Sequence, residues 1–225
     1  MVNQAADSDS PETKTALSSL CRSYWYPLYA FVRRKGYGRA DAEDLTQAFF
    51  TELLEKKRLS VADQSRGRFR SFLLASLDHF MKNDWRSRQA ARRGGGRNIL
   101  SIDFTQADER YSSEPSHDLT AEKVYQRNWA LSVLNQALQA VCQQYEQSDK
   151  TELFEALKMY LGEGVPVPYR EVAEQLGMRE GAVKVAVHRL RTRYGEQLRL
   201  QIARTIDDTR DVDSELSSLF EALGA

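Results

Sequence analysis

Apolar residues recur at spacings of three and four along most of this 225-residue chain, and no stretch keeps the alternation of a β-strand. That period places the apolar side chains on one face of a helix. The chain therefore predicts an all-α fold. The apolar faces of its first three helices hold Leu17, Leu20, Cys21, Tyr24, Leu28, Phe31 and Val32, then Leu45, Phe49, Leu53 and Leu54, then Phe69, Phe72, Leu73, Leu77, Phe80 and Met81.

Prolines and glycines divide this pattern into elements. Pro27 predicts a kink in the first helix or its division into two. Gly36 and Gly38 predict its end, and Asp41 is the expected N-cap of a second helix that ends near Leu59. A third helix is expected from about Arg68 to Ala91, and three such helices can share one small core.

The stretch that follows lacks helical periodicity. It opens on three glycines, Gly94 to Gly96, and is rich in Ser, Asp and Glu. A short apolar group is the exception and is expected to dock on another element: Ile99, Leu100, Ile102 and Phe104. We predict a flexible acidic linker here between two helical domains. The predicted divisions are a disordered N-terminus (1–14), a first domain (15–93), the linker (94–122), a second domain (123–200) and an acidic C-terminal extension (201–225).

Helical periodicity returns in the second half of the chain. The predicted helices there are Val124 to Cys142, Thr151 to Leu161, Tyr169 to Leu176 and Glu180 to Leu198. The C-terminal extension adds a short helix, whose apolar stripe is Leu216, Leu219, Phe220 and Leu223.

The formal net charge is zero, but the charges are segregated into blocks. Residues 82–97 hold six basic residues against one acid, and residues 179–199 hold six against two. The intervening residues 101–122 carry six acids and one arginine. Such segregation predicts two surfaces for a polyanion and an acidic connector.

Residues 169–194 have the spacing of a helix-turn-helix. Val172 and Ala173 pack the first helix, Gly177 makes the tight turn, and Val183 and Val187 pack the second helix. The opposite face of the second helix would enter the major groove of duplex DNA. An ordinary helical hairpin with a solvated basic face is the alternative. The candidate DNA-binding residues are Arg179, Lys184, Val185, His188, Arg189 and Arg191.

Aromatic and basic residues interleave at the end of the third helix and beyond it. Aromatic rings stack on unpaired bases while cations follow the phosphates, so this segment predicts binding of single-stranded DNA. Phe80 and Met81 are better explained as core residues. The candidates are Lys82, Asn83, Trp85, Arg86, Arg88, Arg92 and Arg93.

Acidic and amide side chains open the second helix. Asp44 and Gln47 lie three residues apart and share one face, away from Leu45, and Asp41 precedes them. Such a face can dock on a basic protein surface. A helix cap with solvated acids explains the same residues equally well.

Three segments together resemble the sigma-70 family of RNA polymerase sigma factors, in the two-domain extracytoplasmic-function form. They read DAEDLTQAFFTELLE, RFRSFLLASLDHFMKNDWRSR and YREVAEQLGMREGAVKVAVHRLR. The resemblance covers about 15–93 (region 2, a three-helix bundle) and 129–198 (region 4). It implies a transcription initiation factor whose partners are core RNA polymerase and promoter DNA, both duplex and single-stranded.

The resemblance also implies roles for the candidate residues. Asp41, Asp44 and Gln47 would bind core polymerase. The third helix, with His79 added to the candidates above, would open and hold the −10 element, and the second helix of the helix-turn-helix would read the −35 element. Val185, His79 and Asn83 depart from the residues common in the family, which leaves the preferred bases open.

Other functions find less support in the sequence. The histidines, His79, His117 and His188, are scattered over dissimilar segments, so neither an enzyme nor a metal or cofactor site is expected. No apolar run is long enough to cross a membrane, and the polar start lacks the pattern of a signal peptide, so a cytoplasmic protein with reduced cysteines is expected.

Two alternatives and one question of regulation stay open at this point. A stand-alone helix-turn-helix regulator would explain residues 169–194 but not the segments around Asp41 and Phe72. An adaptor that binds only proteins would not need a basic recognition face. An anti-sigma factor is one further partner that the DNA-facing surfaces could have. The C-terminal helix is another: it either shields a basic surface until a signal releases it or packs permanently on region 4.

Overall fold

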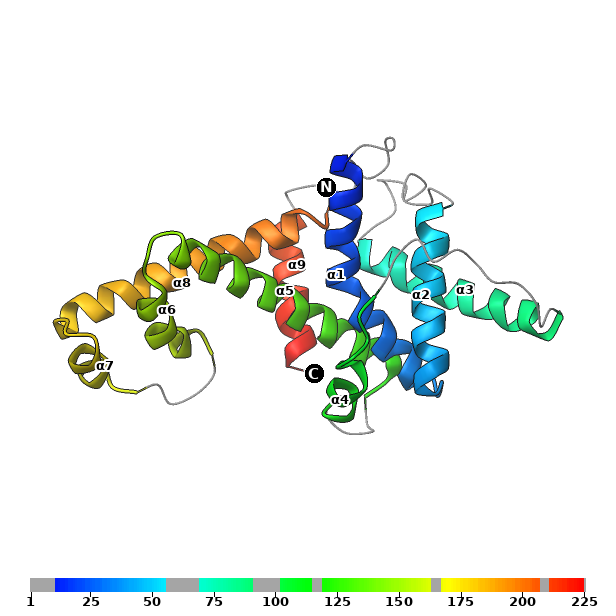
Figure 1. Ribbon diagram of the computed structural model, residues 1–225, viewed down its shortest axis with the longest axis horizontal. Helices are drawn as coiled ribbons and strands as arrows, with labels where there is room; N and C mark the ends of the chain where they lie inside the picture. Colours follow the sequence, from blue (N-terminus) through cyan, green and yellow to red (C-terminus); the bar gives the residue numbers. More distant parts are fainter. Residues whose placement is uncertain are drawn as a thin grey trace. The chain divides into compact units, whose positions relative to one another are not determined.

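The computed structural model describes residues 11–55, 69–90, 102–114, 119–162, 167–206 and 211–224, and the side chains of residues 11–22, 54–55 and 84–90 are excepted. The described ranges form helices joined by turns, with no strand among them (Figure 1). The predicted all-α class is thereby confirmed for this part of the chain. The chain divides into two compact units, Met1–Ser132 with Ala203–Ala225, and Val133–Ile202.

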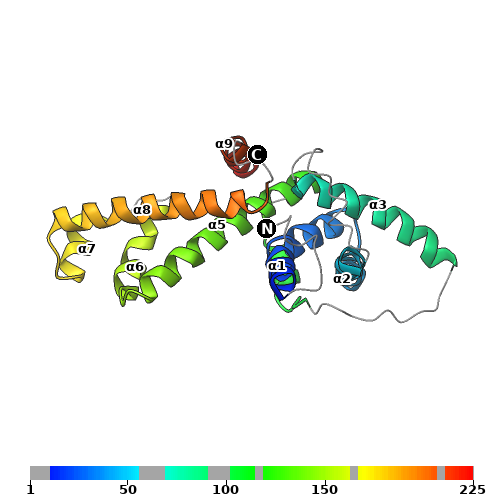
Figure 2. The same cartoon turned by 90° about the horizontal axis from the view of Figure 1, so that it is seen from above.

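The first unit is built on three long helices. Its α1 and α2 lie side by side, and α3 runs across them (Figures 1 and 2). The buried side chains between them include Phe31, Leu45, Phe50 and Leu77. The helices of this unit are α1 (Pro11–Arg34), α2 (Arg39–Glu55), α3 (Phe69–Ala90), α4 (Ala107–Ser112), the first half of α5 (Ala121–Glu146) and α9 (Val212–Leu223).

The ends of α1 and α2 differ in detail from the sequence prediction. Pro27 lies inside α1, which continues as one helix, so a division into two helices is wrong. Pro11 occupies the first helical position, where its missing N–H costs nothing, and α1 therefore begins inside the segment expected to be disordered. Gly36 follows α1 with a positive φ of 95°, as a chain-reversing glycine should.

Asp41 is a first-turn residue of α2 and not its N-cap. The helix begins two residues earlier, at Arg39, because the Gly38 carbonyl already accepts a hydrogen bond from the Ala42 N–H at 3.0 Å. Asp41 still stabilises the helix, because a negative charge in the first turn lies near the positive end of the helix dipole. The predicted end near Leu59 lies outside the described residues, since the described part of α2 ends at Glu55.

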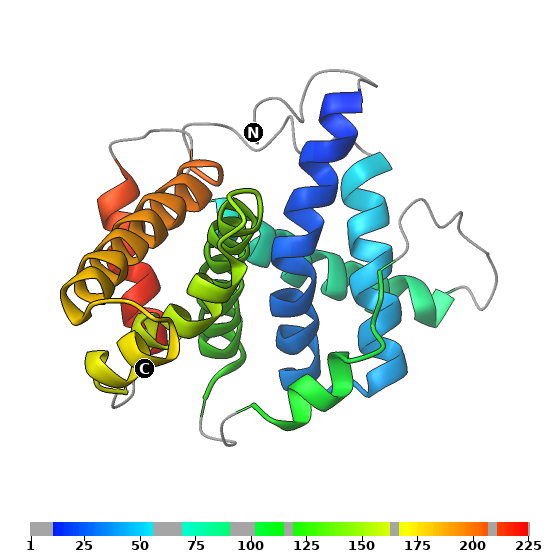
Figure 3. The same ribbon diagram turned by 60° about the vertical axis from the view of Figure 1, so that its left-hand side comes forward.

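Part of the predicted linker is a docked segment. Helix α4 lies along one end of α1 (Figure 3), where Asp108 binds Arg33 and the Tyr26 hydroxyl donates to Glu114 at 3.0 Å. Phe104 packs edge-on against Trp25, as its apolar character predicted. The hydrophobic pattern did not reveal this helix, because Asp108 and Glu114 bind side chains of α1 where apolar residues would otherwise pack. Residues 94–101 and 115–118 of the linker lie outside the described residues.

Helix α9 closes the first unit through a buried ion pair. Glu215 is 2% exposed, and its carboxylate accepts hydrogen bonds from the guanidinium of Arg70 at 2.6 and 3.2 Å. The Arg70 guanidinium also lies 4.3 Å from the centre of the Trp129 ring. Trp129 is fully buried here, although the sequence pattern assigned it to the second domain. Phe220, a member of the predicted apolar stripe of this helix, is 58% exposed.

The second unit combines the end of α5 with four short or medium helical segments, α6 (Thr151–Leu157), η3 (Lys158–Leu161), α7 (Tyr169–Gln175) and α8 (Glu180–Ala203). Its core joins Tyr145 of α5, Leu157 of α6 and Leu190 of α8. The Tyr194 hydroxyl donates to the Leu134 carbonyl at 3.3 Å and ties α8 to α5. The helices predicted from the second half of the chain are therefore confirmed.

Buried tyrosines should make the first unit sensitive to alkali. Burial raises the pKa of Tyr24 and Tyr125 far above the usual value, and burial together with Glu114 does the same for Tyr26. Because the fold favours the neutral phenol, stability present below pH of about 10 is lost as pH rises further. In a titration followed at the tyrosinate absorbance band, we expect these tyrosines to ionise only as the helical circular dichroism disappears. Complete ionisation of the ten tyrosines with intact helix would contradict this.

Candidate nucleic-acid interface

The turn between α7 and α8 is the central feature of the helix-turn-helix. Gly177 has a φ of 63°, a left-handed conformation that glycine adopts without a steric cost. The Met178 N–H donates to the Ala173 carbonyl at 2.9 Å, which satisfies a carbonyl at the end of α7. The sequence prediction of a tight turn at this glycine is confirmed.

The inner faces of α7 and α8 are buried in the core of the second unit. Val172 and Ala173 of α7 contact the same cluster as Val183, Val187 and Leu190 of α8, and the exposed fraction of each is 5% or less. Burial of one whole face fixes the rotation of α8 about its own axis. The residues between these apolar positions must therefore point away from the core.

The outer face of α8 carries the predicted DNA-binding residues. Lys184, His188 and Arg189 are exposed, as is Arg179 in the turn that precedes the helix. Val185 stands among them with 49% of its surface exposed. These residues occupy the first half of α8, the part of a recognition helix that meets base edges in the major groove.

One cation of this face is already paired within the helix. The Lys184 ammonium lies 2.7 Å from the Glu180 carboxylate, one turn earlier, and this hydrogen bond raises the pKa of Lys184 while it lowers that of Glu180. Both groups therefore stay charged at neutral pH. An exposed pair of this kind contributes little stability, so a phosphate can compete for Lys184.

Arg191 has a structural contact in addition to its predicted role. Its Nε and Nη2 donate to the Tyr160 carbonyl at 3.2 and 3.1 Å, at the end of η3. The guanidinium thus satisfies a helix-terminal carbonyl and joins η3 to α8. Arg191 therefore has a part in the fold of the second unit as well as a predicted contact with DNA.

In the first unit, α3 presents a polar face opposite its buried face. Leu73, Leu77 and Met81 are buried, and Phe80 is half-buried against Phe49 with ring centres 5.7 Å apart. Phe80 and Met81 are thus packing residues, as predicted.

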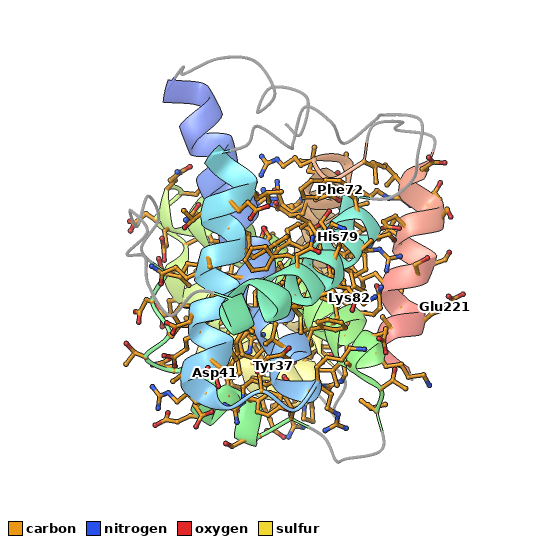
Figure 4. The ribbon with its side chains drawn as sticks, turned by 90° about the vertical axis from the view of Figure 1, so that its right-hand side faces the viewer. Tyr37, Asp41, Phe72, His79, Lys82 and Glu221 are labelled. Carbon is orange, nitrogen blue, oxygen red and sulfur yellow. The ribbon has the colours of Figure 1, made fainter. Side chains whose placement is uncertain are left out.

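His79, Lys82 and Asn83 are exposed on α3. Figure 4 labels the first two of them. The Asn83 amide is 3.2 Å from the His79 ring, and Lys82 is 2.6 Å from Asp78. These contacts hold the side chains along the helix and leave them accessible from outside. The side chains of Trp85, Arg86 and Arg88 at the end of α3, and all of Arg92 and Arg93, lie outside the described residues.

The predicted docking face lies on α2. Asp41 and Asp44 are exposed and Gln47 is half-buried, whereas Leu45 and Phe49 on the other side are buried. Asp41 appears at the lower end of α2 in Figure 4. The structure thus brings these three polar residues to one side of α2. This fits either a docking face or solvated acids near the start of the helix, whereas a cap at Asp41 is wrong because the helix begins at Arg39.

The buried pair of Arg70 and Glu215 was not predicted from the sequence. A signal was present, because each charge stands on an otherwise apolar face: Arg70 lies three residues before Leu73, and Glu215 four before Leu219. A lone charge at a core position predicts a buried partner. Sequence alone does not say that the partner is 145 residues away.

The described residues hold no cluster of three or more potential metal ligands. None of the helices in this part of the chain has the length and apolar character to cross a membrane. Comparisons of the chain with protein-family models, with curated proteins and with solved structures give no match.

Two glycines near the turn allow a matched test of the helix-turn-helix. Gly177→Ala should destabilise the second unit by about 1 kcal/mol because alanine is strained at a positive φ. Gly181→Ala, in α8 with open space around its Cα, should stabilise it by up to about 1 kcal/mol because alanine favours a helix. Urea unfolding measured by circular dichroism would separate the two, and equal effects would contradict the assigned turn.

Proposed function

We propose that the chain is a transcription initiation factor of the extracytoplasmic-function sigma type, which binds core RNA polymerase in the cytoplasm and directs it to promoters. The observation that carries the proposal is α8: its inner face is buried in a helix-turn-helix core, and its outer face is basic and exposed. The exposed polar face of α3, on the other unit, supplies a second surface.

The outer face of α8 suits duplex DNA. Arg179, Lys184 and Arg189 can bind phosphates, and the imidazole of His188 can donate to or accept from a base edge. In the proposed mechanism this helix reads the −35 element, and its phosphate contacts fix the orientation of the second unit on the duplex.

The face of α3 suits the −10 element as a single strand. Asn83 and His79 offer hydrogen-bond donors and acceptors to unpaired bases, and Lys82 offers a charge to the backbone. Opening a duplex costs a few kcal/mol for each extruded base, and these contacts would offset that cost. Asp41, Asp44 and Gln47 on α2 would hold core polymerase, which positions both DNA elements.

A stand-alone regulator remains the second candidate. It accounts for α7 and α8, but it gives no role to the exposed faces of α2 and α3. An adaptor without DNA accounts for neither basic face. Binding to core polymerase therefore distinguishes the proposed function from both.

The α2 face can be tested directly. Asp44→Lys reverses the charge of an exposed residue, so we expect it to weaken the affinity for core polymerase by tenfold or so while the fold is kept. Glu109→Lys, an equally exposed acid on α4, serves as the control and should bind normally. Binding can be measured by fluorescence anisotropy of labelled protein. Equal affinities of the two variants would argue against the α2 face, and no binding by the wild type would refute the sigma proposal.

The basic face of α8 predicts a particular dependence on salt. Removing a phosphate contact with Arg189→Ala should weaken binding of −35 duplexes of any sequence and reduce the slope of log affinity against log salt by about 1. Lys158→Ala, an exposed lysine of η3 in the same unit, should leave the slope unchanged. The reverse result would place the DNA on another surface.

Val185 predicts a preference for thymine. An exposed aliphatic side chain on a groove-facing helix can contact the C5-methyl group of thymine. Replacing individual thymines of a selected −35 duplex by uracil should lower wild-type affinity at one position, by roughly threefold to tenfold. The same replacement should have no effect on Val185→Ser. A uracil effect that persists in this variant would assign the methyl contact to another residue.

A further inference from the structure

The inner face of α9 carries an acidic residue, Glu215, beside its apolar side chains. Glu215 and Leu219 are buried, while neighbouring residues on the other faces, Asp213, Ser217 and Glu221, are exposed. A carboxylate is expensive to remove from water and stays charged only with a partner. Two hydrogen bonds from one guanidinium, at 2.6 and 3.2 Å, supply that partner and also fix the direction of approach.

The partner, Arg70, is the second residue of α3. Its guanidinium is held on three sides, by Glu215 of α9, by the Gln126 side chain of α5 and by the face of Trp129. Its carbonyl accepts a hydrogen bond from the buried Tyr125 hydroxyl at 2.9 Å. The first turn of α3 is therefore fastened from both α5 and α9, and α9 supplies the countercharge.

Helix α9 does not cover the proposed reading face of α3. Arg70 and His79 are nine residues apart, so they are separated by about 13 Å along the helix. His79 and Lys82 remain exposed, and Figure 4 shows them apart from Glu221 on α9. Among the described residues, this geometry favours anchoring of α3 over the shielding considered from the sequence.

We infer that Glu215 is a positioning residue for α3: through Arg70, the C-terminal helix fixes the start of the helix that captures the opened DNA strand. The role in strand capture rests on the proposed function, whereas the coupling of α9 to α3 does not. Capture of an unpaired base needs donors and acceptors held within a fraction of an ångström. A loosened first turn would let the whole of α3 move, and the donors and acceptors would no longer be held in position.

The test compares Glu215→Gln with Glu221→Gln in the full-length chain. Both replacements keep the size of the side chain and remove one negative charge, but only the first removes the countercharge of Arg70. Hydrogen exchange followed by mass spectrometry should show α3 amides exchanging roughly tenfold faster or more in Glu215→Gln, and unchanged in Glu221→Gln. Unchanged exchange in both variants would overturn the coupling.

The role in strand capture needs a second readout, made with core polymerase and promoter DNA. Permanganate reactivity of unpaired thymines should fall several-fold in Glu215→Gln, while affinity for core polymerase and for a −35 duplex stays within twofold or so of the wild type. Equal loss of all three would indicate a merely structural role, and a rise in opening would indicate shielding. Either result would overturn the inference.

A double variant covers the case in which Glu215→Gln folds poorly. Arg70→Gln with Glu215→Gln removes both charges, so its loss of stability should be smaller than the sum of the two single losses. It should still open DNA poorly, because the guanidinium that fastens α3 is gone; normal opening would overturn the role of the pair.

If the wild type fails to bind core polymerase, the proposed function is refuted together with the role of Glu215 in strand capture. The hydrogen-exchange result still decides whether α9 is coupled to α3.

Discussion

The first unit depends on one buried guanidinium. Arg70 joins α3, α5 and α9 through an ion pair, a side-chain amide and an aromatic face, and almost none of it reaches water. Buried ion pairs are not reliable sources of net stability, but breaking one by removing a partner costs about 3–5 kcal/mol. Their better-attested use is to specify one arrangement among several. Here the pair selects which face of α9 docks, and on which turn of α3.

Periodicity predicted most of the helices because each buries a single face. Helices α3, α5, α7 and α8 appear close to their predicted bounds, and the left-handed turn at Gly177 was evident from its residue type. Two features were hidden for a common reason. Helix α4 and the inner face of α9 are packed through charged residues, which a hydrophobic pattern assigns to solvent, and their partners lie far away in the chain.

The candidate site was predictable to a similar degree. Alternation of buried and exposed positions places Lys184, Val185 and His188 outward from α8 once Val183 and Val187 are known to point inward. The contact of Arg191 with the Tyr160 carbonyl was not predictable, because it depends on where η3 ends in space. The charge blocks have two different roles in this chain. Asp108 of the connector and Glu215 of the tail form ion pairs within the fold, whereas Lys184, His188 and Arg189 of α8 are exposed.

The most direct test of the proposed function is transcription started at a defined position. Three reactions would be compared: core RNA polymerase alone, core polymerase with the wild-type protein, and core polymerase with the Asp44→Lys variant. Each would receive a set of promoter fragments that differ only in the −35 and −10 elements, and the 5′ ends of the RNA would be mapped. The proposal predicts one start site that needs the wild-type protein and both elements. Identical transcripts with and without the protein would contradict it.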